Sequence, residues 1–212
     1  MLKRVLGLCL AFCMVFTLMV PGYAQAKESS ISSDTIITED NIYEVLEYLG
    51  IDSSIFVKAD TVTGVSTVGE LEKSISQAKN LPRTVNYTLD STNTPEDTKD
   101  YRLAASGTVG LSSDYEGDSY TVTYGCSGQF SNDKWTGVTG TTISIDTDHE
   151  VFVYKIAPGP QLSATYTSTT ITMKAKYTVE IYVSVFGMGL VKTGTQNIDA
   201  TIKWFASTDI PK

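Results

Sequence analysis

Alternation between apolar and polar positions dominates the second half of the chain. Odd-numbered positions are apolar through residues 173–185, and even-numbered positions are apolar through residues 200–206. A period of two is typical of a strand that buries one face. Because Gly187-Met188-Gly189 supplies a turn between the two runs, the pattern predicts a long antiparallel hairpin with one apolar face.

Shorter runs of the same period precede this hairpin, at residues 85–89, 101–109, 120–126 and 142–145. Residues 151–156 are apolar on both faces, which favours a central strand. The absence of a helical pattern between the runs argues against parallel βαβ units. We therefore predict seven or eight strands in an all-β antiparallel β-sandwich, with a barrel-like variant as the alternative. The apolar positions change from even-numbered to odd-numbered residues after the stretch 162–170. This stretch therefore holds either a bulge or a tight turn between two strands.

Two short N-terminal helices are predicted before the β region. The first has Thr38 as its cap and Gly50 as its stop, and the second starts at a capping box of Thr67 and Glu70. The first helix has one apolar stripe, formed by Ile42, Val45, Leu46 and Leu49. Helices this short need a partner surface. We expect them to dock on the β region, and the alternative is a removable pro-segment.

The first 26 residues have the pattern of a secretory signal peptide. Lys3 and Arg4 precede an apolar run over residues 5–20, and Ala24-Gln25-Ala26 is a small-x-small cleavage site. The run is shorter than the about 20 residues that span a bilayer. We expect cleavage after Ala26 and secretion. The expected organisation is then residues 1–26 as signal peptide, 27–82 as a flexible lead (27–37) followed by the helices, and 83–212 as the β-sandwich domain.

Composition narrows the possible chemistry. A net charge of −8 argues against nucleic acid as a partner. One of the three cysteines, Cys126, lies beyond the signal peptide, so the mature chain has no internal disulfide, and a cysteine-poor secreted chain is typical of a Gram-positive bacterium. Cys126 lies at an even-numbered position, like the apolar residues of the run 120–126, so its side chain should face the core. This favours a buried thiol over a nucleophile paired with His149. No catalytic motif is present, and we predict a protein that is not an enzyme.

Three residues form a candidate ligand site. Trp135 lies in a polar, turn-rich stretch beside Asn132 and Asp133, where an exposed indole would serve as a platform for a sugar ring. The alternative is a tryptophan folded back over the edge of the sandwich, because tryptophan is highly buried on average.

Two acidic loops are candidates for a weak calcium site, the one cofactor that the sequence suggests. The loops contain Asp114, Glu116 and Asp118 in the first and Asp146, Asp148 and Glu150 in the second. Alternating carboxylates can supply oxygen ligands to calcium. Neither loop has the twelve-residue calcium-loop pattern, so the alternative is a solvated acidic turn.

These features predict a secreted protein that acts by surface recognition, with a cell-envelope or extracellular polymer as its ligand. The alternative is a membrane-active protein, of the bacteriocin or pore-forming toxin type, that inserts the long hairpin. In that case the apolar tip with Phe186, Met188 and Leu190 enters the membrane. Without insertion, a turn residue such as Met188 is expected to pack little.

Overall fold

The computed structural model describes residues 31–91, 106–117 and 119–210. The predicted signal peptide, residues 101–105 of one predicted strand, and Asp118 lie outside this part. Residues 32–212 form one unit. None of the described helices is long and apolar enough to cross a membrane.

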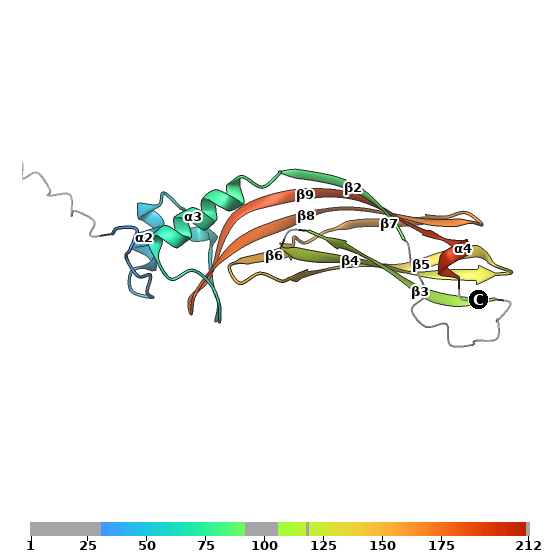
Figure 1. The fold of residues 1–212 in the computed structure, drawn as a ribbon, viewed down its shortest axis with the longest axis horizontal. Coiled ribbons are helices and arrows are strands. Elements are labelled where there is room, and N and C mark those ends of the chain that lie inside the picture. Colours follow the sequence, from blue (N-terminus) through green and yellow to red (C-terminus); the bar gives the residue numbers. More distant parts are fainter. Residues whose placement is uncertain (1–30, 92–105, 118, 211–212) are drawn as a thin grey trace, which may run out of the picture. The chain divides into compact units, whose positions relative to one another are not determined.

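Two open sheets form the predicted all-β sandwich (Figure 1). The smaller sheet has the order β3-β4-β5, with β3 at Ser106–Glu116, β4 at Tyr120–Ser131 and β5 at Lys134–Thr147. The larger sheet contains β1 (Phe56–Lys58), β2 (Thr84–Asp90), β6 (Phe152–Ile156), β7 (Gln161–Tyr166), β8 (Thr170–Val185) and β9 (Gly189–Phe205). Neither sheet closes into a barrel.

The predicted long hairpin is confirmed and forms the centre of the larger sheet. β8 and β9 pair from Thr170 opposite Phe205 to Val185 opposite Gly189. β1 and β2 add to the free edge of β9, and β6 and β7 add to that of β8. The open question over residues 162–170 is answered by a tight turn, because Tyr166 pairs with Ile171 across a β7–β8 hairpin.

Two features of strand pairing differ from the prediction. β6 is an edge strand rather than a central one, since it pairs with β8 alone. Its apolar side chains lie where the two sheets meet, and β5 of the smaller sheet contacts β6 and β7. The pair of β2 and β9 is parallel. These strands are far apart in sequence, so no short turn forces them to be antiparallel.

The core between the sheets combines apolar side chains with buried tyrosines. Cys126 is buried as predicted, and this burial raises the pKa of its thiol to about 11. The hydroxyls of Tyr87, Tyr124 and Tyr177 meet in the same core. The Tyr124 and Tyr177 oxygens are 2.5 Å apart, the Tyr87 and Tyr177 oxygens are 3.2 Å apart, and Tyr87 also bonds to Tyr124.

The two predicted helices are present, followed by a short C-terminal one. α2 spans Ile42–Tyr48, the 3-10 helix η1 spans Ser53–Ile55, α3 spans Val68–Lys79 and α4 spans Ala206–Asp209. α2 starts after Asn41 instead of Thr38. Residues 39–41 form a turn in front of it, and Asn41 Oδ1 accepts a hydrogen bond from the Thr38 N–H at 2.7 Å. The predicted capping box of α3 is confirmed, and Gly50 follows α2 with a φ of +66°.

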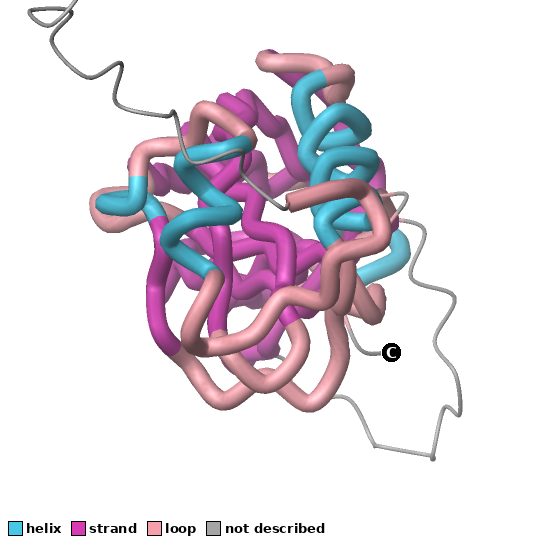
Figure 2. The backbone as a smooth tube through the Cα atoms, turned by 90° about the vertical axis from the view of Figure 1, so that its left-hand side faces the viewer, coloured by secondary structure: helices cyan, strands magenta, loops and turns pink. Residues whose placement is uncertain are grey.

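α2 and α3 lie at the same end of the two sheets, at the left of Figure 1 and toward the viewer in Figure 2. α3 contacts both β8 and β9. Val45, Leu46 and Leu71 have no exposed surface. Residues 32–37 were expected in a flexible lead, but Ile37 is buried and its N–H donates to the Ser66 carbonyl.

Candidate functional site

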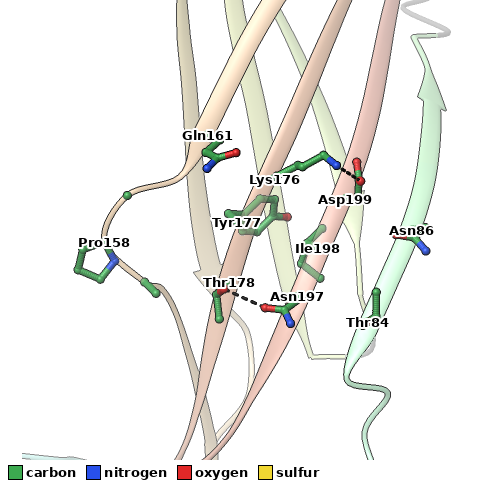
Figure 3. A pocket seen from close by; sticks show the side chains of 12 residues that line it. Thr84, Asn86, Pro158, Gln161, Lys176, Tyr177, Thr178, Asn197, Ile198 and Asp199 are labelled. Carbon is green, nitrogen blue, oxygen red and sulfur yellow. Dashed lines mark hydrogen bonds and ion pairs between the residues drawn. The ribbon is translucent and has the colours of Figure 1, made fainter.

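A groove of about 400 Å³ crosses the larger sheet on the face that points away from the core. β8 and β9 form its floor, β2 lies on one side and the β6–β7 turn on the other (Figure 3). The lining residues are Thr84, Asn86, Ala157, Pro158, Gly159, Gln161, Lys176, Tyr177, Thr178, Asn197, Ile198 and Asp199.

Strand parity places the polar side chains of the groove together. Tyr177 and Ile198 point into the core and are buried. Their neighbours along the strands therefore point to the opposite face. The register then aligns Lys176 with Asp199, and Thr178 with Asn197.

Two contacts across β8 and β9 organise the floor. Lys176 Nζ lies 2.8 Å from Asp199 Oδ2, and the Thr178 hydroxyl donates to Asn197 Oδ1 at 3.0 Å. The second contact fixes the orientation of the Asn197 amide. The Lys176 and Asp199 side chains are 63% and 46% exposed, and an ion pair this exposed contributes only about 0–1 kcal/mol. Both groups can therefore exchange their mutual contact for contacts with a ligand.

The exposed groups of the groove are mostly amides, hydroxyls and one ion pair. Asn86 and Gln161 add two further amides from opposite sides. Groups of this kind donate and accept hydrogen bonds over a broad surface, whereas pockets for small apolar molecules are lined mainly by hydrophobic side chains. The arrangement therefore suits a hydrated ligand that is rich in hydroxyl groups.

The predicted sugar platform is not formed by Trp135. Its side chain is 2% exposed, because it faces the core at the start of β5. The indole packs over Gly128, where a Cβ would lie 2.7 Å from Trp135 Cζ3. Asn132 and Asp133 have φ values of 51° and 56°, as in the type I′ turn of a tight hairpin. The prediction of an exposed indole is therefore wrong, and the alternative of a buried one holds.

The acidic residues do not assemble into the predicted calcium site within the described part of the chain. No group of three His, Cys, Asp or Glu residues there is placed to hold a metal ion. Glu116 and Asp146 lie on either side of Thr121, separated by the width of β4. Asp114 is two residues from Glu116 along an extended strand, which separates their Cα atoms by about 7 Å.

The second acidic loop has a structural role that the sequence did not indicate. Asp148 and Glu150 flank His149 in the connection from β5 to β6, and all three are exposed. His149 Nδ1 accepts hydrogen bonds from the Val151 and Phe152 N–H groups, at 3.0 and 3.1 Å. The imidazole therefore holds the start of β6 in place.

The tip of the long hairpin is covered. Phe186 is exposed, but Met188 and Leu190 are each 6% exposed. The tip is held by residues 59–65: the Ala59 N–H donates to the Met188 carbonyl, and the Gly187 N–H donates to the Thr61 carbonyl. The expectation that Met188 packs little is therefore wrong. Insertion of this tip into a membrane requires the release of residues 59–65.

None of the groove residues was identified as a candidate from the sequence. The alternation identified the polar face of β8 and β9, and a polar face of a strand is normally a solvated surface. Asn86 reaches the same groove from a segment that is far from β8 and β9 in sequence, whereas Gln161 pairs with Lys176 across the β7–β8 hairpin. Their meeting depends on strand order, and the parallel pairing of β2 had no sequence signal.

Comparison with known proteins adds little to this geometry. No family model matches the chain, and no curated protein matches it. A similar solved structure is a two-domain protein of unknown function from Bacteroides thetaiotaomicron. The two chains are 13% identical with a TM-score of 0.28, and the match covers 65% of this chain and 61% of that one. A likeness this weak says nothing about function.

Proposed function

We propose that this protein is a secreted binding protein without enzymatic activity, which recognises an uncharged polysaccharide of the cell envelope or the extracellular matrix. The supporting observation is the groove on the larger sheet. There, β2, β8, β9 and the β6–β7 turn present amides, hydroxyls and one exposed ion pair to the same open surface.

The chemistry of the groove favours a neutral polymer. Sugar hydroxyls both donate and accept hydrogen bonds, as do the amides of Asn86, Gln161 and Asn197. Lys176 is already paired with Asp199, and the whole chain has a net charge of −8. An anionic polymer would therefore meet net repulsion.

The groove offers a poor basis for hydrolysis of such a polymer. Glycoside hydrolysis generally uses two carboxylates on either side of the scissile bond. Among the residues that line this groove, Asp199 is the one carboxylate, and it is paired with a lysine. This supports binding without turnover.

The test is depletion of the purified mature protein from solution by insoluble neutral polysaccharides: chitin, cellulose, mannan and xylan. We expect the protein to bind at least one of them. Asn197→Ala and Gln161→Ala each remove an amide from the groove and should weaken binding about tenfold, the loss expected for one or two hydrogen bonds. Thr201→Ala is the matched control, because Thr201 lies on the same face of β9 outside the groove and should bind as wild type does.

Three results would contradict the proposal. The first is that none of the four polysaccharides depletes the protein. The second is that the two amide variants bind as well as Thr201→Ala. The third is leakage of dye-loaded liposomes on addition of the wild-type protein, which would instead support the membrane-active alternative.

A further inference from the structure

β3 is an edge strand whose second hydrogen-bonding side faces no other described strand. It pairs with β4 along all 11 of its residues, from Ser106 opposite Ser131 to Glu116 opposite Thr121. The backbone N–H and C=O groups of an edge strand that point away from its neighbour can pair with another chain.

Over residues 106–113, β3 lacks the features that normally protect such an edge. Its register with β4 has no shift, and residues 106–113 contain neither a charge nor a proline. β5, the strand at the opposite edge of the same sheet, differs in two ways. Its register with β4 is shifted twice, and it contacts β6 and β7 of the larger sheet. The edge strands β1, β2, β6 and β7 of the larger sheet are shorter than β3, with 3, 7, 5 and 6 residues. Bulges and short length are common ways to block unwanted strand pairing.

The core is already closed behind β3. The Tyr115 ring of β3 stacks on the Tyr87 ring of β2, with centroids 3.9 Å apart and planes 8° from parallel. This stack spans the two sheets on the side where β2 and β3 are the edges. A strand can therefore add to β3 without opening the sandwich.

We propose that β3 pairs with β3 of a second copy of this chain, antiparallel and about a two-fold axis at Leu111, so that the two smaller sheets become one six-stranded sheet. This register uses the full strand. It also keeps the core-facing residues of both copies on one side of the joint sheet, because it pairs residues of the same parity. Opposite residues are then Glu116 with Ser106, Asp114 with Thr108, and Ser112 with Gly110.

The charges on β3 make the strand complementary to a second copy of itself in the antiparallel orientation. Asp114 and Glu116 both lie at one end of the strand, so two parallel copies would place like charges side by side. In the antiparallel dimer each carboxylate faces the hydroxyl of Thr108 or Ser106. A hydroxyl can donate to a carboxylate, and like charges directly opposite each other are destabilising.

The dimer does not depend on polysaccharide binding. Where the proposed function holds, it gives each assembly two grooves, so that binding to a repetitive polymer gains avidity.

Substitution of Thr108 tests the register, because its side chain is exposed on the face away from the core. Thr108→Glu places a carboxylate opposite Asp114 at both ends of the dimer, whereas Thr108→Lys places a cation there. Both changes lower β-propensity to a similar extent, so their difference reports the charge. Thr139→Glu is the control, since Thr139 is exposed on β5 of the same sheet.

The measurement is sedimentation velocity of the purified mature protein from micromolar to near-millimolar concentration, at low and high salt. We expect a reversible dimer for wild type and for Thr139→Glu. Thr108→Glu should weaken dimerisation at least tenfold at low salt, while Thr108→Lys dimerises at least as well as wild type. Thermal unfolding of each variant verifies that it is folded.

A wild-type protein that stays monomeric over this range would overturn the proposal. So would a dimer that Thr108→Glu and Thr108→Lys affect equally, because the β3 register then does not determine it. These outcomes are independent of the polysaccharide assay, which uses variants of the other sheet.

Discussion

Tyr124→Phe removes the central hydroxyl of the buried tyrosine cluster and leaves the ring in place. The Tyr124 side chain has no exposed surface, and its hydroxyl bonds to both Tyr87 and Tyr177. The remaining pair, Tyr87 and Tyr177, keeps its 3.2 Å contact, so neither hydroxyl is left without a partner. We therefore expect a loss of about 1–2 kcal/mol in the free energy of unfolding at pH 7, the usual value for one or two buried hydrogen bonds.

The same variant should have a distinctive dependence on pH. Burial raises the pKa of Tyr124 far above its ordinary value, because the ionised form loses its hydration in the core. In the unfolded chain this phenol titrates near pH 10. A group whose folded pKa is raised stabilises the protein fully below the unfolded pKa, and that contribution is lost as the pH rises above it. At pH 11 the loss for one phenol is about 1.4 kcal/mol.

Tyr124→Phe has no phenol to ionise at this position, so it escapes that loss. Its deficit of about 1–2 kcal/mol at pH 7 should shrink to near zero by pH 11. Urea unfolding at several pH values between 7 and 11 measures the difference directly. Tyr166→Phe is the control, because Tyr166 is half exposed and the loss of its hydroxyl should change the free energy of unfolding little. A deficit for Tyr124→Phe that stays constant from pH 7 to 11 would refute the reasoning.

Two further predictions concern the hairpin tip and the thiol. Met188→Asp should destabilise the protein by about 2 kcal/mol or more, because it places a carboxylate at a position that is 6% exposed, whereas Phe186→Asp should change the melting temperature little because Phe186 is exposed. Equal melting temperatures for the two variants would argue against the covered tip. Cys126 should resist a bulky thiol reagent in the native protein and react on unfolding, since its thiol is buried and its pKa is raised to about 11. Cys126→Ala should cost about 1–2 kcal/mol in urea unfolding.

Local patterns were sufficient for the elements of this fold. The period-two runs predicted β8 and β9, and the pairing of Thr67 with Glu70 predicted the start of α3. These features depend on residues within a few positions of each other, or on one apolar face that must be buried. The same reasoning placed Cys126 correctly in the core.

The identity of neighbouring strands did not follow from those patterns. Alternation shows which face of a strand is buried, but it does not show which strand lies beside it. β6 was therefore expected at the centre and lies at an edge, and the parallel partner of β9 was not foreseen. Trp135 shows a related difficulty, because its polar surroundings are those of a tight turn, while the strand that follows directs the indole inward.

By itself, the sequence determined the class of fold, the long hairpin, the apolar faces of the two helices and the buried thiol. Each of these depends on which side chains must leave water, and composition and period carry that information. The tertiary structure alone decided that Asn86, Gln161 and Asn197 share one groove, that residues 59–65 bond to the hairpin tip, and that β3 is left as an edge. These features join segments distant in the chain, and their meeting depends on the order in which strands pair, which no local pattern of residues encodes.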